Sequence, residues 1–217
     1  MTSSRTETVL AANEDIERLS LDVLLDRLLT SQKAALDRVG EALPSIERAV
    51  EAAVPRLQAG GRLVYAGAGT SGRIGLQDGV ELTPTFGLAP EKLVLLLAGG
   101  AGATTQAAEG AEDREDQARL DLMEHHPNEH DVVIGVAASG NTPYTCAIVQ
   151  CGREVGALTI GVSGNPESRL LREAELGICI PTGAEVLAGS TRMAAGTEQK
   201  VALTLFYTAL MRREGDV

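Results

Sequence analysis

The stretch RLVYAGAGTSGR at residues 62–73 joins a short apolar run to a glycine-rich loop, and a helix-favouring segment follows it. Gly67, Gly69 and Gly72 allow the backbone to approach a ligand closely, and the N-terminus of a helix attracts anions. The pattern therefore predicts a strand, a binding loop and a helix in succession, which is the repeating unit of an α/β protein.

Four more apolar runs end in Gly or Ser in the same way. Together with residues 62–69, the runs span residues 92–100, 131–140, 156–164 and 175–183. All five are nearly continuous in Val, Leu, Ile and Ala, which is typical of strands buried on both faces of a parallel sheet. Helix-favouring segments alternate with them, at 71–81, 103–124, 142–154, 166–174 and 192–213. The sequence predicts an α/β three-layer sandwich around a five-stranded parallel sheet.

Two amphipathic helices are predicted before the first strand. Ser20 is a candidate N-cap for a helix with leucines at helical spacing from Leu21 to Leu29. A second helix has Pro44 near its first turn and ends at Gly60, and Pro55 is expected to bend it or end it early. The residues before them, 1–14, are polar and aperiodic.

Composition limits the possible partners. The 217 residues carry a net charge of -11, so no global field draws nucleic acid to the surface. The sequence has no signal-peptide pattern and no apolar run long enough to span a bilayer, so we expect a cytoplasmic protein without a membrane partner. The three cysteines show no CxxC spacing, and Pro127 interrupts the group His125, His126 and His130, so no metal site is predicted.

Two of the loops that end strands are candidate binding sites. The first is the glycine loop, whose spacing also fits a dinucleotide fingerprint, but the acid expected about 20 residues later is absent and no cofactor is predicted. The second is residues 138–144, where Ser139, Thr142 and the amides near Gly140 would cradle a phosphate. The alternative interpretation is an ordinary turn in which Thr142 caps a helix that starts with Pro143.

Four segments carry a resemblance to a known family. They are GRLVYAGAGTSGRIGLQDGVELTPTFG (61–87), AEGAEDRE (108–115), DVVIGVAASGNTPY (131–144) and GAEVLAGSTRMAAGTEQK (183–200). In this order they resemble the N-acetylmuramic acid 6-phosphate etherases of the sugar isomerase (SIS) domain superfamily, to which the glucokinase regulatory protein is related. The resemblance implies an N-terminal helical arm at 1–52 and an SIS domain at 53–217, without the further C-terminal helical region of the family.

The resemblance also implies a reaction and its residues. These enzymes remove D-lactate from N-acetylmuramic acid 6-phosphate in cell-wall amino sugar recycling, by elimination followed by water addition, without metal or cofactor. The family's catalytic glutamates fall by motif on Glu81, the acid that protonates departing lactate, and on Glu112, the partner for ring opening or C2 proton transfer. From spacing alone, the acidic stretch around Glu112 would be a solvated helix face. Glu81 closes the helix after the glycine loop, and we expect it near the carboxyl edge of the sheet.

The expected substrate contacts come from three segments. They are Gly69, Thr70, Ser71, Gly72, Arg73, Ser139, Gly140, Asn141, Thr142, Ser190, Thr191 and Arg192. The last three would contact the sugar phosphate or cap the final helix. Asn141 stands where the family usually has Arg, and Ala194 where it has Lys, which leads to the hypothesis that recognition of the lactyl carboxylate is weakened or altered.

Three functions fit these features. The chain is expected to be an etherase, and the alternatives are a noncatalytic sugar-phosphate-binding regulator and an aldose-ketose sugar phosphate isomerase. A homodimer is expected because sites in this superfamily tend to lie between subunits.

Overall fold

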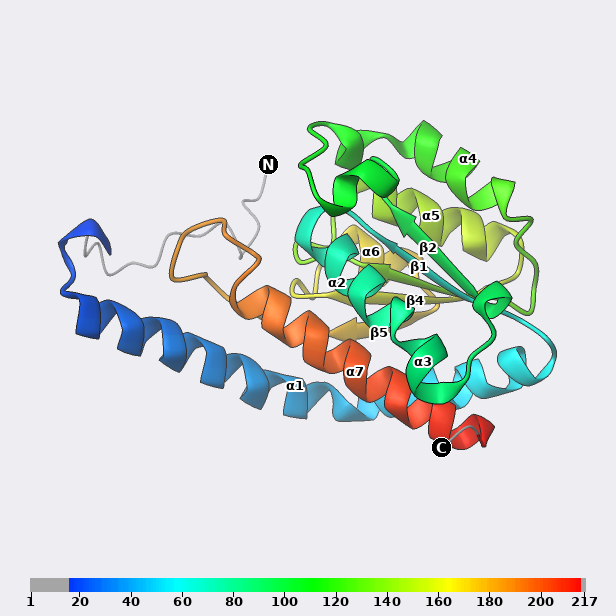
Figure 1. Cartoon of the computed structure of the whole chain (residues 1–217), viewed down its shortest axis with the longest axis horizontal. Coiled ribbons are helices and arrows are strands. Elements are labelled where there is room, and N and C mark those ends of the chain that lie inside the picture. Colours follow the sequence, from blue (N-terminus) through cyan, green and yellow to red (C-terminus); the bar gives the residue numbers. More distant parts are fainter. Residues whose placement is uncertain (1–15, 216–217) are drawn as a thin grey trace.

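A five-stranded parallel sheet forms the centre of the molecule (Figure 1). The computed structural model describes residues 16–215, so the polar segment 1–14 lies outside the described residues. The strands are β1 (Leu63–Gly67), β2 (Leu93–Leu97), β3 (Val132–Val136), β4 (Leu158–Ser163) and β5 (Leu176–Cys179). They lie in the order β2-β1-β3-β4-β5, and every residue of β1, β3 and β4 is buried. The predicted parallel sheet is confirmed.

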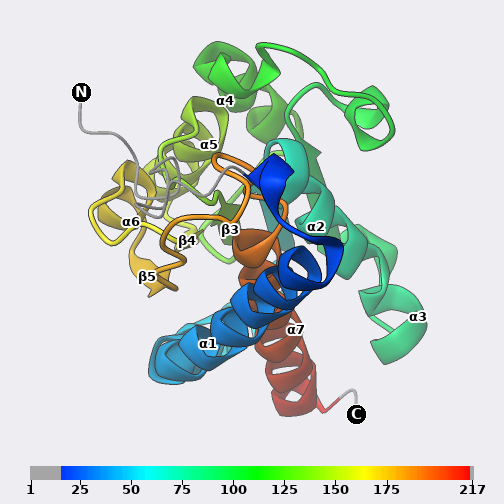
Figure 2. The same cartoon turned by 90° about the vertical axis from the view of Figure 1, so that its left-hand side faces the viewer.

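Helices cover both faces of the sheet and complete three layers. The helices α1 (Leu21–Gln58), α2 (Gly69–Val80) and α7 (Ala194–Glu214) lie on the face to which Leu63 and Tyr65 point. The helices α4 (Glu115–Glu124), α5 (Pro143–Glu154) and α6 (Arg169–Glu173) lie on the opposite face (Figures 1 and 2). The short helix α3 (Leu82–Phe86) follows α2. The predicted three-layer α/β sandwich is therefore confirmed.

The two helices predicted before the first strand are one helix, so that prediction was wrong. α1 runs without a break past Pro44 and Pro55, and the boundary predicted at residue 52 lies inside it. The residues it buries, among them Ala42, Ile46 and Ala49, keep helical spacing on both sides of Pro44. Packing of this face against α7 and the sheet therefore outweighs the one backbone hydrogen bond that a proline removes.

The helix predicted at 103–124 is also shorter than expected. Only α4 is α-helical, and the preceding residues form the 3-10 turns η4 (Ala101–Thr104) and η5 (Ala111–Asp113). Gly110 has a φ of 71°, a left-handed conformation that interrupts a right-handed helix. Residues 99–113 are consequently a loop, which we call the acidic loop because it carries Glu109 and Glu112. Between residues 16 and 215, no helix is long and apolar enough to cross a membrane.

Asp131 joins the amino ends of two central strands. Its fully buried carboxylate accepts hydrogen bonds from Arg62 Nη2 at 2.7 Å, from the Arg62 backbone N–H at 2.9 Å and from the Asn128 N–H at 3.1 Å. Burial alone would raise the pKa of Asp131, but the hydrogen bonds and the charge of Arg62 outweigh it and lower the pKa. The ionised form is therefore the one that stabilises the fold.

We predict that Asp131→Asn lowers the free energy of unfolding at pH 7 by about 2–4 kcal/mol, because it leaves Arg62 without its buried partner. A lowered pKa stabilises the fold above the unfolded-state pKa of about 4 and ceases to do so as the pH falls through the folded-state value. The difference between wild type and variant should therefore shrink below pH 4. Urea unfolding at pH 7, 5 and 3 measures this, with the exposed Asp113→Asn as the control. An equal difference at all three pH values would contradict the prediction.

Candidate functional site

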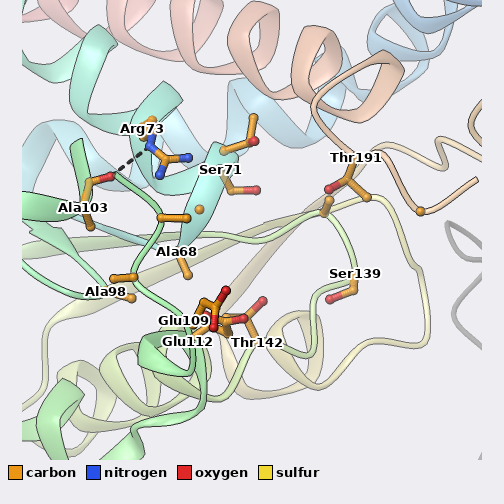
Figure 3. A pocket seen from close by; sticks show the side chains of 16 residues that line it. Ala68, Ser71, Arg73, Ala98, Ala103, Glu109, Glu112, Ser139, Thr142 and Thr191 are labelled. Atoms are coloured by element: carbon orange, nitrogen blue, oxygen red, sulfur yellow. Dashed lines mark hydrogen bonds between the residues drawn. The ribbon is translucent and has the colours of Figure 1, made fainter. Parts of the chain in front are cut away.

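A cavity of about 440 Å³ lies at the carboxyl edge of the sheet. It is bordered by the segments that follow β1 and β3, which are neighbours in the sheet. The chain leaves β1 toward β2 on one side and leaves β3 toward β4 on the other side. Ligands of open parallel sheets bind at this switch point. The lining residues, shown in Figure 3, are Ala68, Gly69, Thr70, Ser71, Arg73, Ala98, Ala103, Ala107, Ala108, Glu109, Glu112, Ala138, Ser139, Thr142, Gly189 and Thr191.

The N-termini of two helices border this cavity. α2 begins at Gly69 and α5 begins at Pro143, directly after Thr142. The first turn of a helix has backbone N–H groups without partners inside the helix, and the helix dipole adds partial positive charge there. Thr142 occupies the predicted N-cap position, but its side chain makes no capping hydrogen bond. Both helix ends are therefore available to an anion.

Side-chain hydroxyls add further donors to the cavity wall. The hydroxyls of Thr70, Ser71, Thr142 and Thr191 make no hydrogen bond to any other described residue. Ser139 Oγ accepts one from the Asn141 N–H at 3.2 Å. The site thus combines neutral donors in the way that a phosphate cradle without lysine requires.

The cavity holds one of the two predicted catalytic glutamates. Glu112 lies on η5 and lines the wall with Glu109. Glu81 lies at the opposite end of α2, whose twelve residues span about 18 Å. That end packs beside Leu93 at the start of β2, whereas the beginning of α2 packs beside Leu97 at its end. The expectation that Glu81 lies near the carboxyl edge was wrong, because α2 runs antiparallel to the strands.

The remaining predicted contacts fall into two groups. Gly69, Thr70, Ser71, Arg73, Ser139, Thr142 and Thr191 line the cavity. Gly72, Gly140, Asn141, Ser190 and Arg192 are not among the lining residues. The Asn141 side chain is used internally, since Oδ1 accepts from the Arg169 N–H at 3.0 Å and Nδ2 donates to the Ser139 carbonyl at 3.3 Å. Ala194 is buried and does not line the cavity either.

Sequence reasoning missed the wall formed by residues 98–109. It treated 103–124 as one helix and so placed no ligand contact there. The sequence did contain a signal for this wall, since Gly99-Gly100 end a predicted strand. The carboxyl ends of parallel strands meet at one edge of a sheet, so this segment had to lie beside the two candidate loops.

The N-terminus of α7 is occupied by a side chain of the protein. Glu185 is 1% exposed, and its carboxylate accepts hydrogen bonds from the backbone N–H groups of Ala194 at 3.0 Å and Ala195 at 2.9 Å. This cap was not predicted, since Ser190, Thr191 and Arg192 were the candidates. Glu185 thereby ties both ends of the segment between it and α7, and this segment contributes Gly189 and Thr191 to the cavity wall. Within residues 16–215, no group of three His, Cys, Asp or Glu side chains is arranged to hold a metal ion.

Comparisons with known proteins agree with the fold and the motifs. Residues 45–152 match the family described as glucokinase regulatory protein N-terminal SIS domain, and residues 104–211 match the SIS domain family. The chain is 47% identical over 211 residues to N-acetylmuramic acid 6-phosphate etherase from Deinococcus radiodurans, covering 97% of this chain and 69% of that protein. It is 43% identical to N-acetylmuramic acid 6-phosphate etherase 1 from Enterococcus faecalis, covering 98% and 71%.

Solved structures with low sequence identity share the fold. A phosphoheptose isomerase from Francisella tularensis superimposes with a TM-score of 0.66 at 16% identity, covering 91% of this chain and 99% of that one. The sugar isomerase domain of an RpiR transcription factor from Sphaerobacter thermophilus superimposes with a TM-score of 0.58 at 16% identity, covering 86% and 90%. These likenesses confirm the SIS-like fold.

We predict that Glu185→Ala lowers the free energy of unfolding by about 1–3 kcal/mol, because two buried N–H groups of α7 lose their acceptor. The exposed Glu175→Ala removes the same charge and serves as the control. Urea unfolding of both variants measures the effect. Equal stability of the two variants would show that the carboxylate is not needed as a cap.

Proposed function

The chain belongs to the N-acetylmuramic acid 6-phosphate etherase family, and from this premise we propose that it cleaves the D-lactyl ether of N-acetylmuramic acid 6-phosphate. The products are D-lactate and N-acetylglucosamine 6-phosphate, and the enzyme is a carbon-oxygen lyase of amino sugar recycling. The observation that carries the proposal is the cavity at the switch point, where two helix N-termini and Glu112 border the same space. A phosphorylated sugar is charged and stays inside cells, so we also propose a cytoplasmic location.

The phosphate of the substrate binds at the N-termini of α2 and α5. Backbone N–H groups of both first turns and the hydroxyls of Ser71 and Thr142 donate hydrogen bonds to its oxygens. Charge-assisted hydrogen bonds of this kind are stronger than neutral ones. They also hold the sugar beside Glu112, which raises the effective concentration of the catalytic carboxylate.

Elimination requires one base and one acid. Once the sugar ring opens, the C2 proton lies alpha to an aldehyde, and the lactyl ether oxygen is on C3. Glu112 first removes the C2 proton, and the electron pair is delocalised onto the aldehyde oxygen as an enolate. The C3–O bond then breaks as a C2–C3 double bond forms, and a second carboxyl group gives a proton to the departing lactate oxygen. Water then adds to C3 by the reverse sequence. No electron acceptor is needed, because the oxidation level of the substrate and water together equals that of the products.

Glu81 is the second carboxyl group, and a second copy of the chain supplies it. Within one chain the length of α2 separates Glu81 from the cavity, yet its side chain is exposed and free to enter a neighbouring cavity. We therefore propose a homodimer in which each cavity combines Glu112 of one copy with Glu81 of the other.

The surface of α1 supports this assembly. None of its residues before Ala35 is buried, and this first part of the helix extends past the sheet in Figure 1. Leu21, Leu25 and Leu29 repeat every four residues there and are 70%, 56% and 54% exposed. An apolar stripe of this kind is typical of a helix that packs against a partner.

The proposed reaction is tested by NMR of the protein with N-acetylmuramic acid 6-phosphate in deuterium oxide. We expect lactate release together with deuterium at C2. Deuteration without lactate would instead support the isomerase alternative, and binding without either signal would support the regulator.

We predict that Glu112→Gln lowers the rates of both lactate release and C2 deuteration by about 10²–10⁴-fold, the usual contribution of a general base. Glu81→Gln should abolish lactate release and retain C2 deuteration, because only the acid is lost. Asp113→Asn, which removes a neighbouring exposed charge outside the cavity, is the control. Loss of both signals in Glu81→Gln would contradict the assignment of the acid.

Mixing the two inactive variants tests the shared site. After subunit exchange, about half of the dimers are mixed and each has one intact site, so about a quarter of the wild-type rate should return. No recovery in a sample whose mixed dimers are confirmed by native mass spectrometry would contradict the arrangement.

A further inference from the structure

The acidic loop, residues 99–113, has buried Ala103 and packs Ala111 against the apolar cluster that includes α5. Its hydrogen bonds to distant described residues come from a single side chain. Arg73 Nε donates a hydrogen bond to the Ala103 carbonyl at 2.9 Å (Figure 3). Arg73 Nη2 donates a second hydrogen bond to the Gln106 carbonyl at 3.2 Å. Among the described residues, these are the only hydrogen bonds that join this loop to a distant part of the chain. Arg73 lies on α2, four residues after Gly69.

The loop has little regular structure of its own to fix it. Its other hydrogen bonds are local, such as Ala103 N–H to Gly100 and Thr104 Oγ1 to Ala101. Gly99, Gly100 and Gly110 have φ values of 87°, 69° and 71°, conformations that glycine adopts at low cost and leaves as easily. Beyond the packing of buried Ala103, the conformation of the loop between β2 and η5 therefore depends on the hydrogen bonds from Arg73 on α2.

We propose that Arg73 is a positioning residue that holds Glu112 against the cavity, an inference that rests on the proposed function. The guanidinium is a planar fork with several N–H donors, so one side chain reaches two carbonyls three residues apart. A lysine ammonium is a point charge with a different reach, so it replaces one of the two bonds.

The same geometry separates this role from phosphate binding. Two of the three guanidinium nitrogens already donate to backbone carbonyls, whereas the hydroxyls of Ser71 and Thr142 have no partner among the described residues. Phosphate affinity should consequently depend on the helix N-termini and hydroxyls, and the rate of proton transfer should depend on Arg73.

The test compares Arg73→Gln and Arg73→Lys with Arg114→Gln. Arg114 adjoins the same loop, and its side chain pairs only with the exposed Asp116, so this variant removes an equal charge without freeing the loop. Three quantities are measured: amide hydrogen exchange of residues 99–113, affinity for N-acetylglucosamine 6-phosphate by calorimetry, and the rate of lactate release.

In Arg73→Gln we expect faster amide exchange confined to residues 99–113, affinity within about twofold of wild type, and lactate release slowed about 10–100-fold, as for a displaced catalytic group. Arg73→Lys should be intermediate in exchange and rate, and Arg114→Gln should equal wild type. Weaker sugar phosphate binding with unchanged loop exchange would overturn the proposal and make Arg73 a ligand-binding residue. Wild-type exchange, affinity and rate in Arg73→Gln would overturn it as well.

Failure of the proposed etherase function can be distinguished from failure of the proposed role of Arg73. If wild-type protein releases no lactate, the etherase assignment fails, while amide exchange still shows whether Arg73 holds the loop.

Discussion

The binding cavity depends on the direct contact between the backbones of Gly67 and Gly72. A Cβ atom built on Gly72 would lie 2.7 Å from the carbonyl carbon of Gly67, and one built on Gly67 would lie 2.6 Å from the Cα atom of Gly72. No larger residue fits either position without moving the backbone. The contact lets α2 start immediately beyond the end of β1, which brings its N-terminus to the carboxyl edge of the sheet, where the connections that follow β1 and β3 lead in opposite directions. The same helix carries Arg73, and Glu81 is its C-cap.

Three helices begin near this edge, and they differ in whether a side chain caps the N-terminus. The N-termini of α2 and α5 have no side-chain cap, whereas α7 is capped by the buried carboxylate of Glu185. An unpartnered N–H group at a buried helix end destabilises the fold, so open helix ends are retained where a ligand can satisfy them. The internal carboxylate of Glu185 therefore occupies the N-terminus of α7, and the proposed phosphate site uses the other two helices.

Sequence reasoning predicted the sheet well because strands buried on both faces have an unmistakable composition. It failed at Pro44, since the cost of a proline is local and the packing that offsets it comes from α7, more than a hundred residues later. It failed again in the acidic loop, where Gly110 interrupts a helix that the flanking residues favour. The expected location of Glu81 was wrong, because the direction of α2 follows from the fold and could not be predicted from the motif. The candidate loops after β1 and β3 line one cavity, and their convergence followed from the parallel topology.

The unbroken course of α1 has a mechanical consequence. Thirty-eight residues of continuous helix form a rod about 57 Å long, with its first part projecting from the sheet and the rest packed on it. Pro44 and Pro55 each remove one backbone hydrogen bond and are the positions at which such a helix can bend, but the continuous helix on either side still links the projecting part to the packed part. A partner that binds the exposed leucines is therefore mechanically coupled, through α1, to β1 and to the cavity at its end.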